Sequence, residues 1–307
     1  MPLVSVIMNV RNGAAFLREA LDCVMAQTFR DWEMIVWDDC STDDSARIVA
    51  QYKDPRIRYF LSPVETPLGM ARDNAIQQST GEWLAFLDQD DLWTTTKLEK
   101  QMKVATDGVA IIYGRAVLTW PNGRERDYDQ AHEFTPLPEG NIFAELFRSA
   151  CFIAMSSAVL RRSAVQEAGG IPEWIELTPD YYLYAALARQ YEARAVQEVV
   201  CRYRVHSGSM TRSRRRRLYE EPLAIVDRWA NELDPQIVNY RRMTYSTALA
   251  VEELCSLGSA RQGIMRLFTQ GSVIWLLSRP VVHALRAIRR RVQRPYRLET
   301  EFKSAPD

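Results

Sequence analysis

Hydrophobic residues in the first third of the chain fall into short runs separated by helix-like segments. Continuous runs occur at Leu3–Val10, Met34–Trp37 and Trp83–Leu87, with a weaker alternating run at Ile57–Leu61. Continuous apolar runs of this length are typical of strands buried on both faces, as in a parallel sheet. From Ala14 to Gln27 the apolar positions recur instead with the period of an amphipathic helix. Strands and helices that alternate in this way predict a βαβ series with right-handed crossovers.

The pattern continues less regularly after this series and changes near residue 213. Strand-like and helical segments follow one another, and from Leu218 onward the periodicity is only helical. We therefore predict a catalytic domain over residues 1–212, with halves of about 1–107 and 108–212, and a helical extension over 213–307. Within the second half we expect strands at 109–118, 151–160 and 196–205, helices at 142–147 and 180–191, and a hairpin turn followed by loop at 120–140.

Carboxylates follow two of the predicted strands where each one ends. The second strand runs into Asp38 and Asp39, and the fourth runs into Asp88, Asp90 and Asp91. In open α/β sheets, ligands bind at the carboxyl ends of the strands. Carboxylates grouped there suit a hard divalent cation that also holds phosphate oxygens. The alternative is a solvated turn followed by a helix cap, and this stretch alone does not decide between the two.

Composition narrows the class of protein. The chain is 47% hydrophobic and 25% charged, which is ordinary for a globular protein. Lys plus Arg and Asp plus Glu both number 39, so net charge indicates no polyanionic partner, and we expect no nucleic acid. The five cysteines are scattered, without a CxxC pair. This pattern indicates a reducing compartment and argues against a zinc site or a disulfide framework.

Several ordered motifs together resemble a known family. They are Val4-Ser-Val-Ile7, Val36-Trp-Asp-Asp39, Asp54-Pro-Arg-Ile-Arg58, Gly69-Met-Ala-Arg72 and the stretch Gly81–Asp91. In this order and spacing they resemble family 2 inverting glycosyltransferases with the GT-A fold, closely over about residues 3–103 and more loosely over 150–211. The resemblance implies a mostly parallel, mixed α/β sheet flanked by helices.

The resemblance also implies an activity and its partners. The donor is expected to be a UDP-, GDP- or dTDP-sugar, the acceptor a saccharide or lipid-linked saccharide hydroxyl, and the cofactor Mg²⁺ or Mn²⁺. By analogy the product belongs to cell-surface polysaccharide or lipopolysaccharide biosynthesis. Two other classes stay open on the sequence. One is a nucleotidyltransferase, and the other is a non-catalytic nucleotide-sugar-binding or scaffold protein of a polysaccharide assembly complex.

The acidic residues acquire expected roles from this resemblance. Asp90 is expected to bind the metal ion, and Asp88 to face the ribose or assist at the metal. Asp91 is expected to support the site from behind or to cap the next helix, and to be the most replaceable of the three. Asp39 resembles the acid that contacts the nucleotide base. Asp38 is either a ligand contact or part of the loop structure.

Basic and amide residues complete the expected nucleotide site. Arg72 is expected to reach the nucleotide or its phosphates, the alternatives being a surface arginine or a partner for Asp38 or Asp39. Asn9 and Arg11 stand where the family often has a small hydroxyl residue and a tyrosine near the base. We count both as nucleotide-sugar-binding positions, and this departure leaves the base preference open.

The second half of the chain carries the expected catalytic base. An inverting reaction needs a group that takes the proton of the acceptor hydroxyl. Thr178-Pro-Asp-Tyr-Tyr182 resembles the family segment that supplies it, so Asp180 is the candidate, with an ordinary acid in a first helical turn as the alternative. In Tyr203-Arg-Val-His206, His206 is expected to bind the metal or touch the diphosphate, or else to be a packing histidine. Arg204 is expected to neutralise the diphosphate or to lie on the surface.

The end of the chain is strongly basic. From Leu254 to Leu298 there are nine arginines and no Asp or Glu. Short apolar blocks beside these arginines suit a helix lying on an anionic membrane surface, the alternative being a helix packed on the catalytic domain. No apolar run is long enough to span a bilayer, and the first residues do not resemble a signal peptide. We therefore expect a cytoplasmic protein, peripheral at the inner face of the plasma membrane.

Overall fold

The computed structural model describes residues 1–128, 134–206, 208 and 216–255. The chain forms two compact units, Met1–Val238 and Asn239–Asp307, and each is considered by itself. The boundary predicted after residue 212 falls among residues outside the described part, so that division stays a prediction. Most of the basic segment Leu254–Leu298 also lies outside the described residues. Within the described part, no helix is long and apolar enough to cross a membrane.

Strands and helices alternate along the first unit as the hydrophobic pattern predicts. The strands are β1 (Val4–Val10), β2 (Trp32–Asp38), β3 (Ile57–Leu61), β4 (Trp83–Phe86), β5 (Leu92–Trp93), β6 (Val109–Thr119), β7 (Glu125–Asp127), β8 (Val159–Arg161) and β9 (Glu192–Arg204). The helices are α1 (Leu17–Met25), α2 (Ser45–Val49), α3 (Leu68–Gln77), α4 (Lys97–Met102), α5 (Phe143–Arg148), α6 (Arg162–Glu167), α7 (Pro179–Ala188) and α8 (Arg217–Arg228). A further helix, α9, spans Pro235–Cys255, so the described residues after 216 are helical, as predicted.

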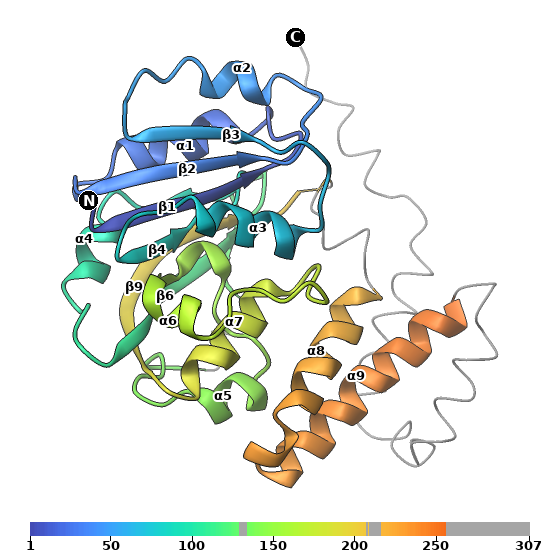
Figure 1. Cartoon of the computed structure of the whole chain (residues 1–307). Coiled ribbons are helices and arrows are strands. Elements are labelled where there is room, and N and C mark those ends of the chain that lie inside the picture. The colour runs from blue at the N-terminus through green and yellow to red at the C-terminus, as the bar shows by residue number, and fades with distance from the viewer. Residues whose placement is uncertain (129–133, 207, 209–215, 256–307) are drawn as a thin grey trace. The chain divides into compact units, whose positions relative to one another are not determined.

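The strands form one mixed sheet in the order β3-β2-β1-β4-β8-β6-β9-β5, with β7 paired to β6 (Figure 1). β1 to β4 are mutually parallel, and β6 and β9 are also parallel. In the centre, Ile7 of β1 pairs with Ile35 of β2 on one side and Phe86 of β4 on the other. The carboxyl ends of β2 and β4 therefore flank the end of β1, which brings both acidic pairs to one edge, as predicted.

Helices cover both faces of the parallel half of this sheet. On one face, Leu17 and Leu21 of α1 pack in a common core with Met8 and Met34 of the sheet. These side chains are fully buried, and each such burial stabilises the fold by roughly 1.5–3 kcal/mol. Helix α3 lies on the opposite face, in front of the strands in Figure 1. The continuous apolar strands follow from this arrangement, because both faces are covered.

The structure corrects three expected elements in the second half. Residues 151–160 do not form one strand, because a 3-10 turn at Met155–Ser157 precedes the short β8. The amides of Ser157 and Ala158 bond within that turn, to Ala154 and Met155, instead of to a neighbouring strand. Helix α7 ends at Ala188, before the expected Tyr191. Strand β9 begins at Glu192 instead of Val196, since the Glu192 amide already donates to the carbonyl of Gly108.

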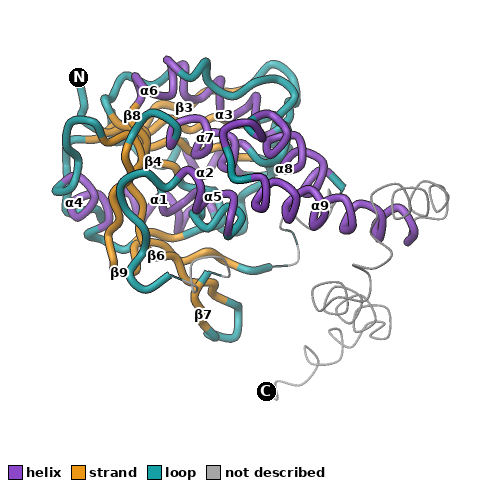
Figure 2. Tube along the Cα trace, turned by 90° about the horizontal axis from the view of Figure 1, so that it is seen from below, coloured by secondary structure: helices purple, strands orange, loops and turns teal. Residues whose placement is uncertain are grey.

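The predicted turn after β6 is a hairpin. The Trp120 amide donates to the Arg124 carbonyl, and the Gly123 amide donates to the Trp120 carbonyl. Gly123 has a φ of 76°, a conformation that glycine adopts without steric cost. Figure 2 shows this hairpin, labelled by β7, standing out from the body of the sheet.

Candidate active site

The three acids after β4 occupy one tight turn, in which the Asp91 amide donates to the Asp88 carbonyl at 3.0 Å. Asp91 is 1% exposed and points inward. Its carboxylate accepts a hydrogen bond from the Ser156 hydroxyl at 2.5 Å and another from the Arg204 amide at 3.0 Å. Burial raises the pKa of Asp91 well above its ordinary value, and the neighbouring Asp88 and Asp90 raise it further. Asp91 therefore ties the turn to β9 and to the 3-10 turn.

Asp91 does not cap the next helix, contrary to one of the two roles expected for it. Helix α4 begins at Lys97, and its N-cap residue is Thr96, which makes no side-chain capping bond. The expectation that Asp91 is the most replaceable acid also fits poorly with its burial. A buried carboxylate that two donors satisfy leaves both donors unpaired when it is removed.

The structure brings Asp90 together with His206, 116 residues later. The His206 Nε2 atom lies 2.7 Å from Asp90 Oδ2, and both side chains stay partly exposed. Burial raises the pKa of Asp90, and repulsion by Asp88 adds to this effect, while His206 opposes it. The His206 ring packs against Phe16 with centroids 4.6 Å apart. The two expected metal-binding residues are therefore neighbours.

Arg72 lies between two acids of the expected site. It is 5% exposed, and its guanidinium forms an ion pair with Asp88. Burial opposes the charge on Arg72, but the carboxylates of Asp88 and Asp180 outweigh burial and raise its pKa. The alternatives of a surface arginine and of a partner for Asp38 or Asp39 are therefore wrong. Arg72 instead pairs with the acidic turn, and the carboxylate of Asp180 in the first turn of α7 adds to its pKa through charge.

Asp180 is the second residue of α7, after Pro179. Its carboxylate is partly exposed and accepts the amide hydrogen of Tyr181 at 2.8 Å. Burial raises the pKa of Asp180, whereas Arg72 lowers it in part. Asp180 is thus an acid whose pKa is raised by burial, and a raised pKa favours general-base catalysis.

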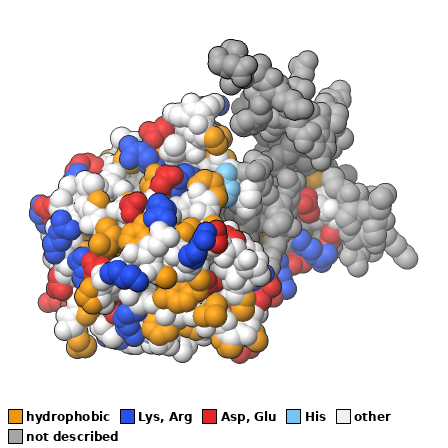
Figure 3. Space-filling model, turned by 90° about the horizontal axis from the view of Figure 1, so that it is seen from above, with side chains coloured by type: hydrophobic (Ala, Val, Ile, Leu, Met, Phe, Trp, Pro, Cys, Tyr) orange, Lys and Arg blue, Asp and Glu red, His pale blue; other side chains and the backbone are white. Residues whose placement is uncertain are grey.

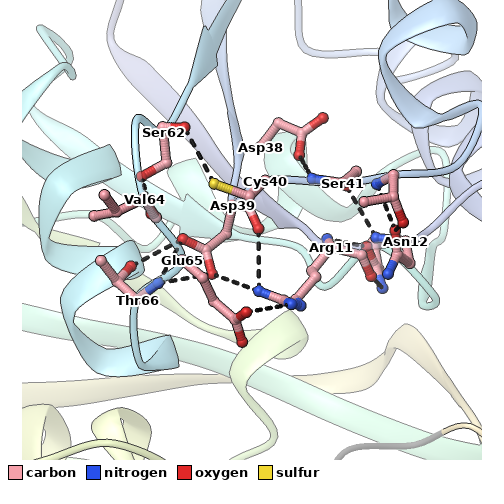
Figure 4. A network of polar contacts seen from close by, with 12 residues as sticks. Arg11, Asn12, Asp38, Asp39, Cys40, Ser41, Ser62, Val64, Glu65 and Thr66 are labelled. Carbon is pink, nitrogen blue, oxygen red and sulfur yellow. Dashed lines mark hydrogen bonds and ion pairs between the residues drawn. The ribbon is translucent and has the colours of Figure 1, made fainter.

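The acids after β2 have different partners (Figure 4). Asp39 accepts hydrogen bonds from the amide and hydroxyl of Thr66, at 3.0 and 2.9 Å. Arg11 reaches Asp39 at 3.5 Å and forms a closer ion pair with Glu65 at 2.6 Å. Figure 4 shows Arg11 pointing toward Asp39 and Glu65 at the end of the sheet. These residues form one polar cluster around Asp39.

Asp38 is engaged in holding the loop. One carboxylate oxygen accepts the Ser41 amide at 2.8 Å, and the other accepts the Tyr59 hydroxyl at 2.7 Å. Asp38 is 1% exposed, so little of it faces a ligand. Of the two interpretations of Asp38, the geometry favours loop structure.

Asn9 and Arg11 at the end of β1 lie beside the acidic turn. The Asn9 carboxamide nitrogen is buried and has no hydrogen-bond partner among the described residues. The Arg11 backbone is held by Gln89, whose side chain accepts from the Arg11 amide at 2.8 Å and donates to its carbonyl at 3.1 Å. Gln89 was not predicted as a site residue. Its place between Asp88 and Asp90 was the signal that could have identified it.

Arg204 supports the turn from the other side and is not a free surface cation. Its Nε donates to the Asp90 carbonyl, and its Nη1 pairs with Glu19 at 2.8 Å. The guanidinium also lies over the Phe16 ring, 4.8 Å from the centroid. Because Glu19 already balances this charge, Arg204 acts first as a structural tie between α1 and the acidic turn. Ser156, which was also not predicted from the sequence, holds the acidic turn through its hydrogen bonds with Asp91 and Asp88.

Two of these residues could hold a divalent cation. No group of three or more His, Cys, Asp or Glu side chains is arranged to hold a metal ion among the described residues. Asp90 and His206 nevertheless offer two ligand atoms on adjoining, partly exposed side chains. Mg²⁺ commonly uses one or two carboxylates together with substrate phosphates and water. The pair fits a cation whose other ligands come from a diphosphate.

Figure 3 shows Lys and Arg side chains interspersed with Asp and Glu on the face that it presents. On this face of the described residues, the distribution agrees with the balanced composition.

Comparison with known proteins identifies the family. Residues 5–169 match the model of glycosyl transferase family 2. The chain is 31% identical over 223 residues to UDP-Glc:alpha-D-GlcNAc-diphosphoundecaprenol beta-1,3-glucosyltransferase WfaP of Escherichia coli, covering 72% of this chain and 84% of that protein. It is 33% identical to WfgD, also from E. coli and named for the same activity, over 36% of this chain and 45% of WfgD. The chain thus spans most of WfaP and less than half of WfgD.

Solved structures agree on the fold. S. aureus TarS 1-349 in complex with UDP-GlcNAc superposes with a TM-score of 0.67 at 18% identity, covering 88% of this chain and 80% of TarS. The mannosyltransferase PcManGT from Pyrobaculum calidifontis, in complex with GDP-Man and Mn²⁺, gives 0.59 at 20% identity, covering 91% and 81%. Both confirm the expected GT-A fold, and family membership decides against the nucleotidyltransferase and the non-catalytic alternatives. The chain belongs to glycosyltransferase family 2 and is a glycosyltransferase.

Proposed function

We propose that this enzyme transfers a sugar from a nucleotide-diphosphate sugar to an acceptor hydroxyl with inversion at the anomeric carbon, assisted by Mg²⁺ or Mn²⁺. The observation that carries the proposal is the buried Arg72, which forms an ion pair with Asp88 of the acidic turn and whose charge also acts on Asp180 of α7. One cation therefore influences an acid suited to the donor side and an acid suited to the acceptor side. Two acids in different environments are the usual basis for separate chemical roles.

In this proposal Asp180 is the general base. It takes the proton of the acceptor hydroxyl while the acceptor oxygen forms a bond to the anomeric carbon. The bond from that carbon to the phosphate oxygen breaks, and the nucleoside diphosphate leaves. The raised pKa of Asp180 makes it a stronger base than an ordinary aspartate, and Arg72 keeps it deprotonated over a wider pH range.

The other residues hold the donor. Asp39 and Arg11 would contact the base and ribose, the unpaired Asn9 amide group would donate to the nucleotide, and Asp88 would lie near the ribose. Asp90 and His206 would hold the divalent cation, which supplies a Lewis acid for the charge that develops on the leaving diphosphate.

The acceptor class follows from the relatives. WfaP and WfgD are named for transfer to GlcNAc-diphosphoundecaprenol, and a Campylobacter jejuni relative, 36% identical over 122 residues, for transfer to GalNAc(5)-diNAcBac-PP-undecaprenol. We propose a lipid-linked saccharide acceptor and a role in surface polysaccharide assembly. A lipid-linked acceptor would place the reaction at a membrane surface, in keeping with the basic segment Leu254–Leu298.

The test is a transfer assay with UDP-glucose or GDP-mannose, Mn²⁺ and a GlcNAc-diphosphate-lipid acceptor. Nucleoside diphosphate release gives the rate, and proton NMR of the product gives the anomeric configuration. Asp180→Asn should lower kcat by about 10²- to 10⁴-fold, the range of general-base catalysis, while UDP binding persists. Asp90→Asn should raise the Mn²⁺ concentration needed for activity, whereas Asp107→Asn, which alters an exposed acid, should change neither. Retention of configuration or full turnover by Asp180→Asn would contradict the proposal.

A further inference from the structure

The position of Asp180 depends on the four residues that lead into α7. That segment, 175–178, meets the carboxylate of Glu221 in α8, which is 2% exposed. One Glu221 oxygen accepts the amides of Glu176 and Leu177, at 3.1 and 3.2 Å. The other accepts the amides of Leu177 and Thr178, at 3.0 and 2.8 Å, and the Thr178 hydroxyl at 2.9 Å. Three successive amides therefore converge on one buried side chain.

The donors to Glu221 show what this carboxylate does. The groups that donate to the Glu221 carboxylate are three backbone amides and the Thr178 hydroxyl. Among the described residues, hydrogen bonds rather than a lysine or arginine therefore stabilise this buried carboxylate. A buried charge is tolerated only when such bonds satisfy it. Thr178 occupies the N-cap position of α7 but makes no side-chain capping bond, because its hydroxyl donates to Glu221. Glu221 thus holds the N-cap residue of α7 and the two residues before it.

The same segment is held on its other side by α3, the helix that carries Arg72. The Gly69 amide donates to the Glu176 carbonyl at 3.1 Å. A Cβ atom at Gly69 would stand 1.9 Å from the Ile175 carbonyl oxygen, so only glycine permits this approach. The Ile171 amide also donates to Asp73 of α3 at 3.0 Å. The residues before α7 are therefore clamped between α3 and α8.

We propose that Glu221 is a positioning residue for the reaction. By holding the start of α7 against α3, it keeps the Asp180 carboxylate beside Arg72 and in line with the donor site. This inference rests on the proposed role of Asp180 as general base. It also places a residue needed for full activity beyond residue 212 and beyond the family match at 5–169. The catalytic unit would then include α8.

The test compares Glu221→Gln with Glu220→Gln in the full chain. Glutamine keeps the shape of Glu221 but points an N–H₂ group at the amide donors. Glu220 is the adjacent acid of α8 and pairs with Arg216 at 2.6 Å on the surface, so it is a matched control. With UDP-glucose as donor, Glu221→Gln should lower kcat by about 10- to 100-fold, because small displacements of a catalytic group have such effects. KM for the donor and the affinity for UDP should stay within about twofold, as should all three quantities in Glu220→Gln.

A second pair of variants covers the case in which Glu221→Gln does not fold. Thr178→Ala removes one donor to Glu221, and Thr178→Ser keeps it. Thr178→Ala should lower kcat by about threefold or more at unchanged UDP affinity, and Thr178→Ser should restore it. A wild-type kcat in a folded Glu221→Gln, or a wild-type kcat in Thr178→Ala, would overturn the inference.

Asp180→Asn, measured in parallel, separates the two proposals. If Asp180→Asn turns over normally, the base assignment is wrong and the positioning role falls with it. If Asp180→Asn is inactive while Glu221→Gln and Thr178→Ala keep the wild-type kcat, only the positioning role is wrong.

Discussion

Ser156 provides a quantitative test of how the acidic turn is held. Its hydroxyl donates to the buried Asp91 carboxylate at 2.5 Å and accepts the Asp88 amide at 3.1 Å. The neighbouring Ser157 is equally buried, but its hydroxyl donates to a neutral group, the Ala154 carbonyl, at 2.7 Å. Ser156→Ala therefore removes a hydrogen bond to a charged group and the acceptor of the Asp88 amide, whereas Ser157→Ala removes one neutral hydrogen bond at the adjacent position.

The two substitutions should lower the free energy of unfolding by different amounts. A hydrogen bond to a charged group contributes about 1.5–3 kcal/mol to stability, and a neutral one about 0.5–1.5 kcal/mol. We expect Ser156→Ala to lower the free energy of unfolding by about 2–3 kcal/mol and Ser157→Ala by about 1 kcal/mol. In a domain of this size, about 2 kcal/mol corresponds to a melting temperature lower by about 4–8 °C.

The loss of stability should depend on pH for Ser156→Ala and not for Ser157→Ala. Burial raises the pKa of Asp91 in the folded state, so its contribution to stability is complete below its unfolded pKa and declines as pH rises through the folded pKa. The Ser156 hydrogen bond lowers the pKa of Asp91. Without this bond the folded-state pKa is higher, so stability continues to fall up to a higher pH. The difference between wild type and Ser156→Ala should therefore be larger at about pH 8 than at about pH 5. The difference for Ser157→Ala should not change with pH.

Urea unfolding followed by tryptophan fluorescence, with EDTA present and at both pH values, measures these free energies. Ser156→Ala and Ser157→Ala both keep the three acids, so comparing the two variants reports on the Ser156 hydrogen bond to Asp91. Equal costs for Ser156→Ala and Ser157→Ala, or a Ser156→Ala cost that shrinks as pH rises, would refute the reasoning.

Two further predictions concern catalysis and binding. Because burial raises the pKa of Asp180 and the base acts when deprotonated, kcat should fall on the acid side with a midpoint above the ordinary aspartate value of about 3.9. Arg72→Met should move this midpoint up by about one pH unit or more, since Arg72 lowers the pKa of Asp180, and an unmoved midpoint in a pH–rate profile would contradict this electrostatic effect. Arg11→Ala should weaken UDP binding about tenfold by calorimetry, the effect of one charge-assisted hydrogen bond. Its melting temperature should hardly change, because the ion pair with Glu65 is partly exposed, and an unchanged UDP affinity would exclude Arg11 from the nucleotide site.

The parallel half of the fold could be predicted because its strands are buried on both faces. Val6 and Leu84 are fully buried, and the strands that carry them are largely apolar in the sequence. Asp39 and the acidic turn lie at the same edge of the sheet because β1 pairs in parallel with both β2 and β4.

The second half was less predictable, because there distant contacts decide the local structure. Residues 151–160 have the apolar content of a strand, but Ser156 and Ser157 direct their hydroxyls to Asp91 and to the Ala154 carbonyl, within a 3-10 turn. Helix α7 is almost wholly buried, so its apolar pattern has no period that marks its end. Its start depends on Glu221, more than 40 residues away along the chain.

The roles of the three acids in the turn could be named from the sequence but not tested by it, since each depends on its partner. Three carboxylates within four residues would repel one another, and the structure gives each a different compensation. Arg72 balances Asp88, and the Ser156 hydroxyl and Arg204 amide satisfy Asp91. Among the described side chains, Asp90 pairs with the imidazole of His206, which is charged only when protonated, and Asp90 remains partly exposed. Of the three acids, Asp90 therefore has the weakest permanent compensation, and it is the acid to which a diphosphate-bound cation would add the most.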